Sequence, residues 1–276
     1  MVQQQVKAAA FRGLHTGKEI LLLPNAWDVA SARVIEESGS KAIATTSAGI
    51  AFSLGYPDGQ KIPRDEMISV IARIVKAVKI PVTADVEAGY GNTAEDAART
   101  ARAVLDAGAV GMNLEDAAGA ALVDLPLQLE KIRAVREMAS RLRIMLVLNA
   151  RTDAYLLHIG DPGKRYDETL RRLSAFREAG ADCVFAPGLK DASTIGRLVA
   201  DLKCPLNILS GPGSPSLPEL SKLGVARVSL GSSTMRATLG YLRRIAEELK
   251  TAGTYSKLED APSHAEMNRM MEEKQS

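Results

Sequence analysis

The sequence predicts a single α/β domain of the (β/α)8 TIM-type barrel class, and three observations favour this fold. Apolar, β-branched runs alternate with helical patterns eight times along the 276 residues, and each unit has nearly the length that such barrels use in roughly 250 residues. The strand runs are apolar along their length, as strands buried on both faces must be. Glycine turns of the type Ala-Gly-Ala or Leu-Gly-Val stand just before several strands, where they end the preceding helix.

A doubly wound open sheet is the alternative fold class. Such a sheet usually has fewer strand–helix units and a glycine-rich turn after its first strand. The first predicted strand of this chain is followed by Asn25-Ala26-Trp27-Asp28 instead. The barrel is therefore the favoured fold.

The predicted strands are short apolar runs bounded by turn-forming residues. They lie at residues 19–24, 41–46, 81–85, 109–115, 143–149, 181–187, 204–210 and 225–231. The predicted helices show helical period and end at glycine or polar residues. They lie at 2–16, 29–39, 64–79, 92–108, 128–141, 166–178, 192–203, 216–224 and 233–250. A long loop rich in glycine and serine, closed by Pro63, is expected after the second strand.

The order of these elements shows no linker, so we expect one domain over residues 1–276. The barrel core spans about 18–250 and has a helix in front of it. The polar segment at about 254–276 is expected to be a frayed or partner-docking extension.

Composition excludes several classes of protein. The formal net charge is +2, from 35 basic and 33 acidic residues, and aromatic residues make up 4%, so we expect no nucleic-acid partner. No apolar run approaches the ~20 residues that span a membrane, and the first residues lack the apolar core of a signal peptide. Cys183 and Cys204 lie in apolar runs without a zinc or disulfide pattern, which indicates a protein of the reducing cytoplasm.

Polar residues follow the predicted strands at their carboxyl ends. A barrel gathers these ends around one mouth, where active sites lie. Strands two to five and strand seven contribute Thr45, Thr46, Ser47, Asp85, Glu87, Glu115, Asp116, Asn149, Arg151, Asp153, Asn207 and Ser210. The first and sixth strands are less informative.

Three of these carboxylates suggest a metal site. Asp85 and Glu87 have strand spacing, so they point the same way if the strand continues that far. Adjacent carboxylates repel each other unless a cation lies between them. With Glu115 from the next strand, they could hold Mg²⁺ or Mn²⁺, partly through water. The plainer alternative is a solvated strand end followed by a turn.

Further residues at the mouth suit a carboxylate substrate. Arg151 offers a planar fork for a carboxylate, and Thr46, Ser47 and the backbone at Ala48 offer donors to an anion. A metal that polarises a carbonyl, with such donors beside it, describes a site for a 2-oxo or 2-hydroxy acid that reacts through an enolate. The glycine-containing segment 210–214 leaves phosphate binding as an alternative.

Each of these residues also has a purely structural alternative. Arg151 could pair with Asp153 across a turn, Glu115 could pair with an arginine of a neighbouring helix, and Asn207 could cap a loop. Asp58, within Tyr-Pro-Asp-Gly, is most simply a turn residue. The three histidines are not clustered, which argues against a histidine metal site or a Ser-His-Asp triad.

Five motifs occur in order at the first five strand ends: NAWDVASA, TTSAGIAFSLGYPDG, ADVEAGYGN, GMNLED and NARTD. This set resembles the isocitrate lyase and phosphoenolpyruvate mutase superfamily over essentially the whole barrel. The resemblance implies a Mg²⁺-dependent barrel that makes or breaks C–C or P–C bonds of 2-oxo or 2-hydroxy acids through a pyruvate-like enolate. It also implies a homotetramer, a dimer of dimers, in which the last helix is exchanged between subunits.

The resemblance assigns roles to individual residues. The implied metal ligands are Asp85, Glu87 and Glu115. The implied catalytic residues are Arg151, Asp58 and Glu115. The substrate-binding residues that we expect are Thr46, Ser47, Ala48, Asp85, Asn149, Arg151 and Asn207.

The segment after the fourth strand departs from the family pattern. Lyase members carry a Lys-Arg-Cys-Gly-His type lid there, with cysteine as the catalytic acid, and the mutase and phosphonopyruvate hydrolase branches carry Lys and Asn. Residues 116–124 contain no cysteine, lysine or asparagine. Because loss of CO₂ requires no protein acid, the favoured function is a Mg²⁺-dependent lyase or decarboxylase, similar to an oxaloacetate decarboxylase. The alternatives are carboxyvinyl-carboxyphosphonate or phosphoenolpyruvate mutase-type chemistry, and a non-catalytic protein that binds a 2-oxo acid.

Overall fold

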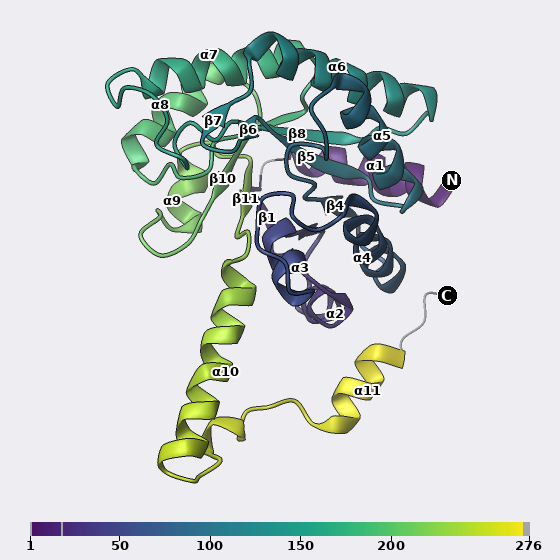
Figure 1. Cartoon of the computed structure of the whole chain (residues 1–276), viewed down its shortest axis with the longest axis vertical. Helices are drawn as coiled ribbons and strands as arrows, with labels where there is room; N and C mark the ends of the chain where they lie inside the picture. The colour runs from purple at the N-terminus through teal and green to yellow at the C-terminus, as the bar shows by residue number, and fades with distance from the viewer. Residues whose placement is uncertain (1, 18, 273–276) are drawn as a thin grey trace.

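The computed structural model describes residues 2–17 and 19–272, and a parallel barrel dominates it (Figure 1). Its sheet has the strand order β1-β11-β10-β9-β8-β5-β4-β3-β2. The strands of this sheet are β1 Leu21–Leu23, β2 Asn25–Ala26, β3 Ile43–Thr45, β4 Val82–Ala84, β5 Gly111–Glu115, β8 Val147–Arg151, β9 Cys183–Phe185, β10 Leu206–Leu209 and β11 Arg227–Ser229.

The barrel closes through the first strand, which is split at Pro24. Its first half, β1, pairs with β11, and its second half, β2, pairs with β3. Proline has no N–H to donate, so the ladder is interrupted there, although the Pro24 carbonyl still accepts from Ala44 N at 3.2 Å. The nine strand segments therefore form an eight-stranded barrel, and the predicted fold class is confirmed.

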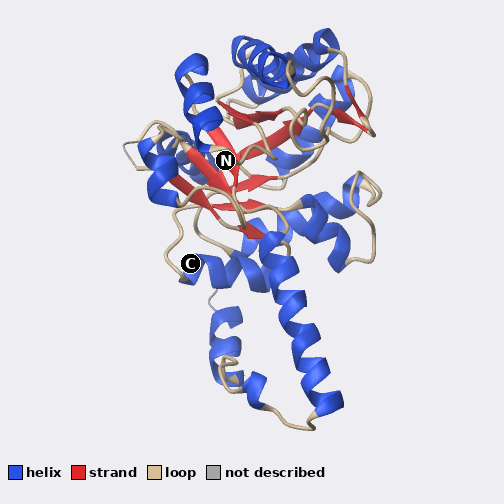
Figure 2. Ribbon diagram, turned by 90° about the vertical axis from the view of Figure 1, so that its left-hand side faces the viewer, coloured by secondary structure: helices blue, strands red, loops and turns tan. Residues whose placement is uncertain are grey.

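Helices surround the barrel, as the side view in Figure 2 shows. They are α1 Val2–Leu14, α2 Val29–Glu37, α3 Ser47–Ser53, α4 Arg64–Ala77, α5 Ala94–Asp106, α6 Leu125–Arg141, α7 Arg165–Glu178, α8 Ala192–Leu202, α9 Leu217–Lys222, α10 Ser233–Thr251 and α11 His264–Glu272. A 3₁₀ turn, Ser256–Leu258, lies between the last two. No helix among the described residues combines the length and the apolar character that a membrane crossing requires.

Helix α1 closes the amino-terminal end of the barrel. Gln4 Nε2 donates to the carbonyls of Leu105 (2.8 Å) and Ala109 (3.1 Å), which precede β5. Phe11 is completely buried, and a Cβ placed on Gly111 would lie 2.8 Å from its ring. The open mouth of the barrel is therefore the opposite end, where the strands finish.

The structure corrects two local predictions near that mouth. Residues after the second strand were expected to form a loop, but Ser47–Ser53 is helix α3, because the Thr46 side chain caps it by accepting from Gly49 N at 3.3 Å. The third strand does not continue to Glu87. It ends at Ala84, and Glu87 has φ 52°, in the left-handed region, so Asp85 and Glu87 do not share strand geometry.

The last part of the chain leaves the barrel. Helix α10 extends away from it (Figures 1 and 2), and Leu239, Leu242 and Leu249 on this helix are 47%, 57% and 44% exposed. Part of the tail that was expected to be polar and frayed forms α11, which packs against α2 and places Arg269 3.9 Å from Glu37. Residues 273–276 of the expected extension lie outside the described residues.

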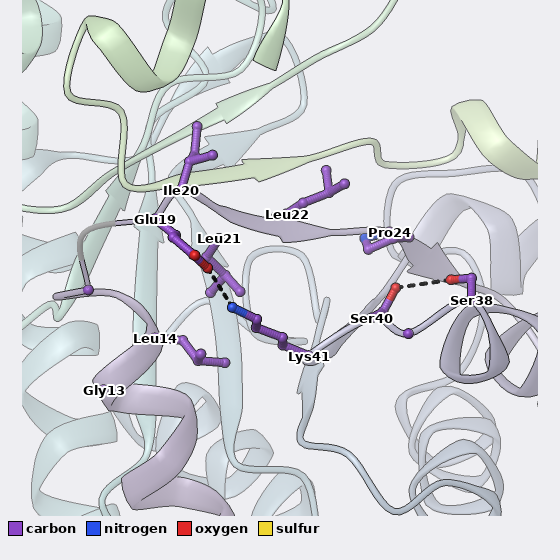
Figure 3. A pocket seen from close by; sticks show the side chains of 12 residues that line it. Gly13, Leu14, Glu19, Ile20, Leu21, Leu22, Pro24, Ser38, Ser40 and Lys41 are labelled. Carbon is purple, nitrogen blue, oxygen red and sulfur yellow. Dashed lines mark hydrogen bonds and ion pairs between the residues drawn. The ribbon is translucent and has the colours of Figure 1, made fainter. Parts of the chain in front are cut away.

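The outer side of β1 lines an open groove in the described structure. The groove has a volume of about 650 Å³ and lies between the end of α1 and the turn that follows α2 (Figure 3). Ile20, Leu22 and Pro24 line it, and Leu22 is 38% exposed. An ion pair between Glu19 and Lys41, 2.6 Å long, crosses one part of the groove.

Candidate active site

A cavity of about 250 Å³ lies at the carboxyl ends of the strands. Loops that lie far apart in the sequence build it, because the barrel brings the ends of β3, β4, β5 and β8 to one mouth. Its lining residues are Ser47, Asp58, Gly59, Gln60, Glu87, Glu115, Ala117, Gly119, Arg151, Asp153, Leu156 and Leu157.

Arg151 is the only cation that lines this cavity within the described residues. Its Nη1 lies 2.7 Å from Glu115 Oε2, while Nε and Nη2 donate to the two Asp153 oxygens at 2.5 and 2.9 Å. Burial alone would lower the pKa of Arg151, but the adjoining carboxylates of Glu115 and Asp153 outweigh burial and raise it. The pairing with Asp153 that was the structural alternative does form, and Arg151 still faces the cavity.

Asp85 lies directly behind the cavity wall. Its Oδ2 accepts from the backbone N–H and the hydroxyl of Ser47, at 3.0 and 2.9 Å, and its Oδ1 accepts from Asn113 Nδ2 at 3.3 Å. Ser47 is the first residue of α3, so the positive end of that helix faces this carboxylate. Asp85 is 9% exposed and is held from both sides.

Glu87 presents an incompletely satisfied carboxylate. Its Oε2 accepts from Gln60 N at 2.6 Å, whereas its Oε1 is buried and has no hydrogen-bond partner in the described part of the chain. Burial, together with the charges of Asp85 and Asp58, raises the pKa of Glu87 to about 7. A buried oxygen without a partner indicates a place where a cation or an ordered water would bind.

Glu115 and Asp58 complete the acidic wall. Burial raises the pKa of Glu115 well above its usual range, and the charge of Arg151 opposes this rise. Asp58 is exposed to solvent, yet its pKa is also raised, chiefly by partial desolvation of its carboxylate. Its Oδ1 accepts from Gly59 N at 3.0 Å, as in a turn, but the turn places Asp58 in the cavity wall.

The other predicted substrate-binding residues lie outside the lining. Asn149 and Asn207 are fully buried inside the barrel, where Asn149 Nδ2 donates to Asn113 Oδ1 at 2.8 Å and Asn207 Nδ2 to Ser229 Oγ at 3.2 Å. Thr46 and Ala48 are buried in the first turn of α3. The structure therefore brings Ser47, Arg151 and the acids together at the cavity.

Two residues of the site were not predicted from the sequence. Gln60 links Glu87 to Tyr90, since its side-chain oxygen accepts from Tyr90 N at 2.7 Å. Asn113 lies between Asp85 and Asn149. The alternation of inward residues along β5 could have indicated Asn113, because it precedes Glu115 by two positions. The sequence carries no comparable signal for Gln60.

The segment above the cavity is a small antiparallel hairpin of β6 (Ala117–Ala118) and β7 (Ala121–Leu122). Asp116 at its base is completely buried, accepting from Asp153 N at 3.0 Å and from Arg172 Nη1 at 3.1 Å. Burial raises the pKa of Asp116 to about 6. The hairpin residues described at the cavity wall, Ala117 and Gly119, offer it small, apolar contacts beside the partly exposed Leu156 and Leu157.

The sequence and the fold of this chain are both similar to those of known proteins. Residues 11–250 match the family model described as phosphoenolpyruvate phosphomutase. A crystal structure of a proposed lyase/mutase from Burkholderia cenocepacia J2315 has a TM-score of 0.92 and 40% identity, and the match covers 98% of this chain and 96% of that one.

Two curated relatives have named activities. The oxaloacetate decarboxylase of Ectopseudomonas mendocina (strain ymp) is 30% identical over 84% of this chain and 80% of its own length. The 2-methylisocitrate lyase of Bacillus subtilis (strain 168) is 30% identical over 74% of this chain and 67% of its own length.

Proposed function

Because the chain belongs to the phosphoenolpyruvate mutase/isocitrate lyase superfamily of lyases and mutases, we propose that it is a Mg²⁺-dependent lyase or decarboxylase of a small 2-oxo or 2-hydroxy acid. The observation that carries this proposal is the charge of the cavity. Among the described residues, four carboxylates line it, those of Asp58, Glu87, Glu115 and Asp153, against one cation, Arg151. The described lining therefore has a formal charge of −3 when every group is ionised.

An anionic substrate cannot enter such a cavity at low energetic cost unless a cation accompanies it. Hard oxygen donors and the unpartnered Oε1 of Glu87 fit Mg²⁺, with Mn²⁺ as its substitute. Among the described residues, no group of three or more acidic, histidine or cysteine side chains is arranged to hold a metal ion by itself. We therefore assign the metal to Asp85, Glu87 and Glu115 together, with water completing its coordination.

When bound, the metal would polarise the 2-oxo group and stabilise an enolate. The chain's own residues bind and orient the acid. A guanidinium has five N–H donors, and the three contacts of Arg151 with Glu115 and Asp153 leave two for a substrate carboxylate. Glu115 and Asp153 hold the fork in place, so little rotamer entropy is lost when the substrate binds.

The lid favours decarboxylation over a reaction that needs a lid acid. The wall formed by Ala117, Gly119, Leu156 and Leu157 carries no proton donor. Asp116, at the base of the lid, faces Arg172 rather than the cavity. A departing carboxylate becomes neutral CO₂ and needs no proton, so an apolar wall suits this leaving group. The oxaloacetate decarboxylase among the relatives supports the same substrate class.

A panel of 2-oxo and 2-hydroxy acids with Mg²⁺, followed by product analysis, tests this proposal. We expect turnover of an oxaloacetate-like acid that EDTA abolishes and that Glu115→Gln lowers by about 100-fold or more. The matched control is Glu137→Gln, because Glu137 lies at the surface and pairs with the exposed Arg141 at 2.5 Å. Tight binding without turnover across the panel would instead support the non-catalytic 2-oxo acid binder.

We also propose a cytoplasmic homotetramer, a dimer of dimers, in which α10 of one subunit covers the groove beside β1 of another. The exposed leucines of α10 and the apolar groove of about 650 Å³ support this exchange, and the free Cys183 and Cys204 support the compartment. Light scattering should show an assembly that Leu242→Asp dissociates, whereas Leu258→Asp outside α10 should leave it intact. A monomeric unaltered protein would exclude the exchange.

A further inference from the structure

Arg227 is the largest side chain that is fully buried in the barrel. It lies on β11, in register with Leu21 of β1 and Asn207 of β10. No salt bridge joins it to a carboxylate of the described residues, and its Nε and Nη1 have no hydrogen-bond partner there. A buried cation without an acidic partner is costly, so its presence calls for an explanation beyond packing.

The one hydrogen bond that the Arg227 side chain makes among the described residues leads to the candidate metal site. Its Nη2 donates to Asn113 Oδ1 at 3.4 Å, and the same oxygen accepts from Asn149 Nδ2 at 2.8 Å. The other end of the Asn113 amide, Nδ2, donates to Asp85 Oδ1 at 3.3 Å. Residues of β11, β5 and β8 thus form one hydrogen-bonded chain that ends on Asp85, just after β4.

Two asparagines alone would not fix the direction of this chain. An amide has an acceptor end and a donor end, and Asn149 Oδ1 has no partner among the described residues. If both amides turned over, Asn113 would donate to Asn149 Oδ1, and their mutual bond would survive. Asn113 would then present its oxygen, and not its NH₂ group, to the Asp85 carboxylate.

Arg227 and the ionised Asp85 carboxylate impose the same direction from opposite ends, because a guanidinium can only donate and a carboxylate can only accept. The guanidinium requires an acceptor, so Asn113 must present its oxygen to Arg227 and its NH₂ group to Asp85. We propose that Arg227 is a positioning residue that fixes the direction of the Asn149–Asn113 amide pair and thereby holds Asp85 in a metal-binding orientation. The inference rests on the proposed function, since Asp85 is one of the carboxylates assigned to the metal.

A series of substitutions separates this role from a packing role. Arg227→Lys keeps a donor-only group, Arg227→Gln introduces an amide that donates or accepts, and Arg227→Met provides neither. The probe is Mn²⁺ alone, measured by electron paramagnetic resonance on the full chain. Loss of a group that orients a metal ligand typically weakens metal binding about 10–100-fold.

We expect Arg227→Met to weaken Mn²⁺ binding by at least 10-fold, Arg227→Gln to weaken it by a smaller factor, and Arg227→Lys to stay within about 3-fold of the unaltered protein. The unfolding midpoint of Arg227→Met should be equal to or above that of the unaltered protein, because an unpaired buried charge is removed. A packing role predicts the reverse, namely a lower midpoint with unchanged Mn²⁺ affinity, and that result would overturn the inference.

Two further outcomes are decisive. If Arg227→Met does not fold, the Lys and Gln variants, which both retain a long polar side chain, decide the matter, and equal Mn²⁺ affinities in those two overturn the role of Arg227. If the unaltered protein itself binds no Mn²⁺, with or without a 2-oxo acid, the metal-dependent function and the inference fall together. Equal affinities across a series that does bind Mn²⁺ overturn the inference alone.

Discussion

Replacing Arg151 by lysine keeps the positive charge of the cavity but removes its planar fork. The guanidinium makes one contact with Glu115, at 2.7 Å, and two with Asp153, at 2.5 and 2.9 Å. An ammonium group is a compact donor on a flexible stem and does not match two carboxylates held at fixed angles. We expect the lysine to retain one of the three contacts.

The magnitude follows from the two contacts that are lost. Hydrogen bonds to charged groups contribute about 1.5–3 kcal/mol each, and the lower value applies because lysine leaves neither carboxylate without a cation. The free energy of unfolding should therefore fall by about 3 kcal/mol. At about 2.1 cal/mol/K of unfolding entropy per residue, the 276-residue chain should lose about 5 °C in its midpoint.

Urea unfolding at one fixed protein concentration measures this change, because assembly would otherwise shift the apparent stability. The control is Arg141→Lys, whose guanidinium bonds the exposed Glu137 on the same helix at 2.5 Å. Exposed pairs contribute little, so its effect should stay below about 0.5 kcal/mol. A loss below about 1 kcal/mol in Arg151→Lys, or equal losses in both variants, would refute the assigned geometry.

Three other predictions concern the floor of the barrel and the metal. Burial and then the charge of Arg227 lower the pKa of His15 to about 4, so the unfolded state binds more protons between about pH 6.5 and 4. The unfolding free energy should therefore drop by about 3 kcal/mol as pH falls through that window, and His15→Gln should flatten this slope. If the unfolding free energies of His15→Gln and the unaltered protein fall with pH in parallel, this prediction is wrong. Gly111→Ala should lower the free energy of unfolding by about 1–3 kcal/mol, because the added methyl lies 2.8 Å from the Phe11 ring. Equal free energies of unfolding in urea for this variant and the unaltered protein would contradict that. Mg²⁺ at about 100 times its Kd should raise the free energy of unfolding by about 2.7 kcal/mol, as calorimetry can measure. Glu87→Gln should reduce this gain. An unchanged gain in that variant would exclude a role for Glu87 in metal binding.

The barrel and the position of its mouth were predictable because they depend on local patterns. Apolar runs alternate with amphipathic helices, and parallel connection then places Asp85, Glu115 and Arg151 at one end whatever the details of the loops. Asp58 illustrates the limit of such patterns. Its sequence predicts a turn, which it forms, but only the folded chain shows that the turn borders the cavity.

The remaining features depend on contacts between distant segments. Glu87 takes a positive φ while it accepts from Gln60, 27 positions earlier in the chain, and no local propensity encodes that bond. Arg227 and Asn113 are 114 positions apart and meet only when the barrel closes. Helix α3 was missed because glycine and serine favour loops on average, whereas the cap by Thr46 decides this case.

The base of the lid hairpin is held by hydrogen bonds that do not involve the tip of the hairpin. Val123 N donates to the Asp116 carbonyl at 2.8 Å, and Arg172 Nη1 reaches both Asp116 Oδ2 and the Val123 carbonyl, at 3.1 and 3.0 Å. The residues between these two anchoring positions can therefore change in length and in side chains while the barrel and its acidic wall stay as they are. Evolution or a protein engineer could retune the choice of substrate by grafting at this one site, without rebuilding the charged groups beneath it.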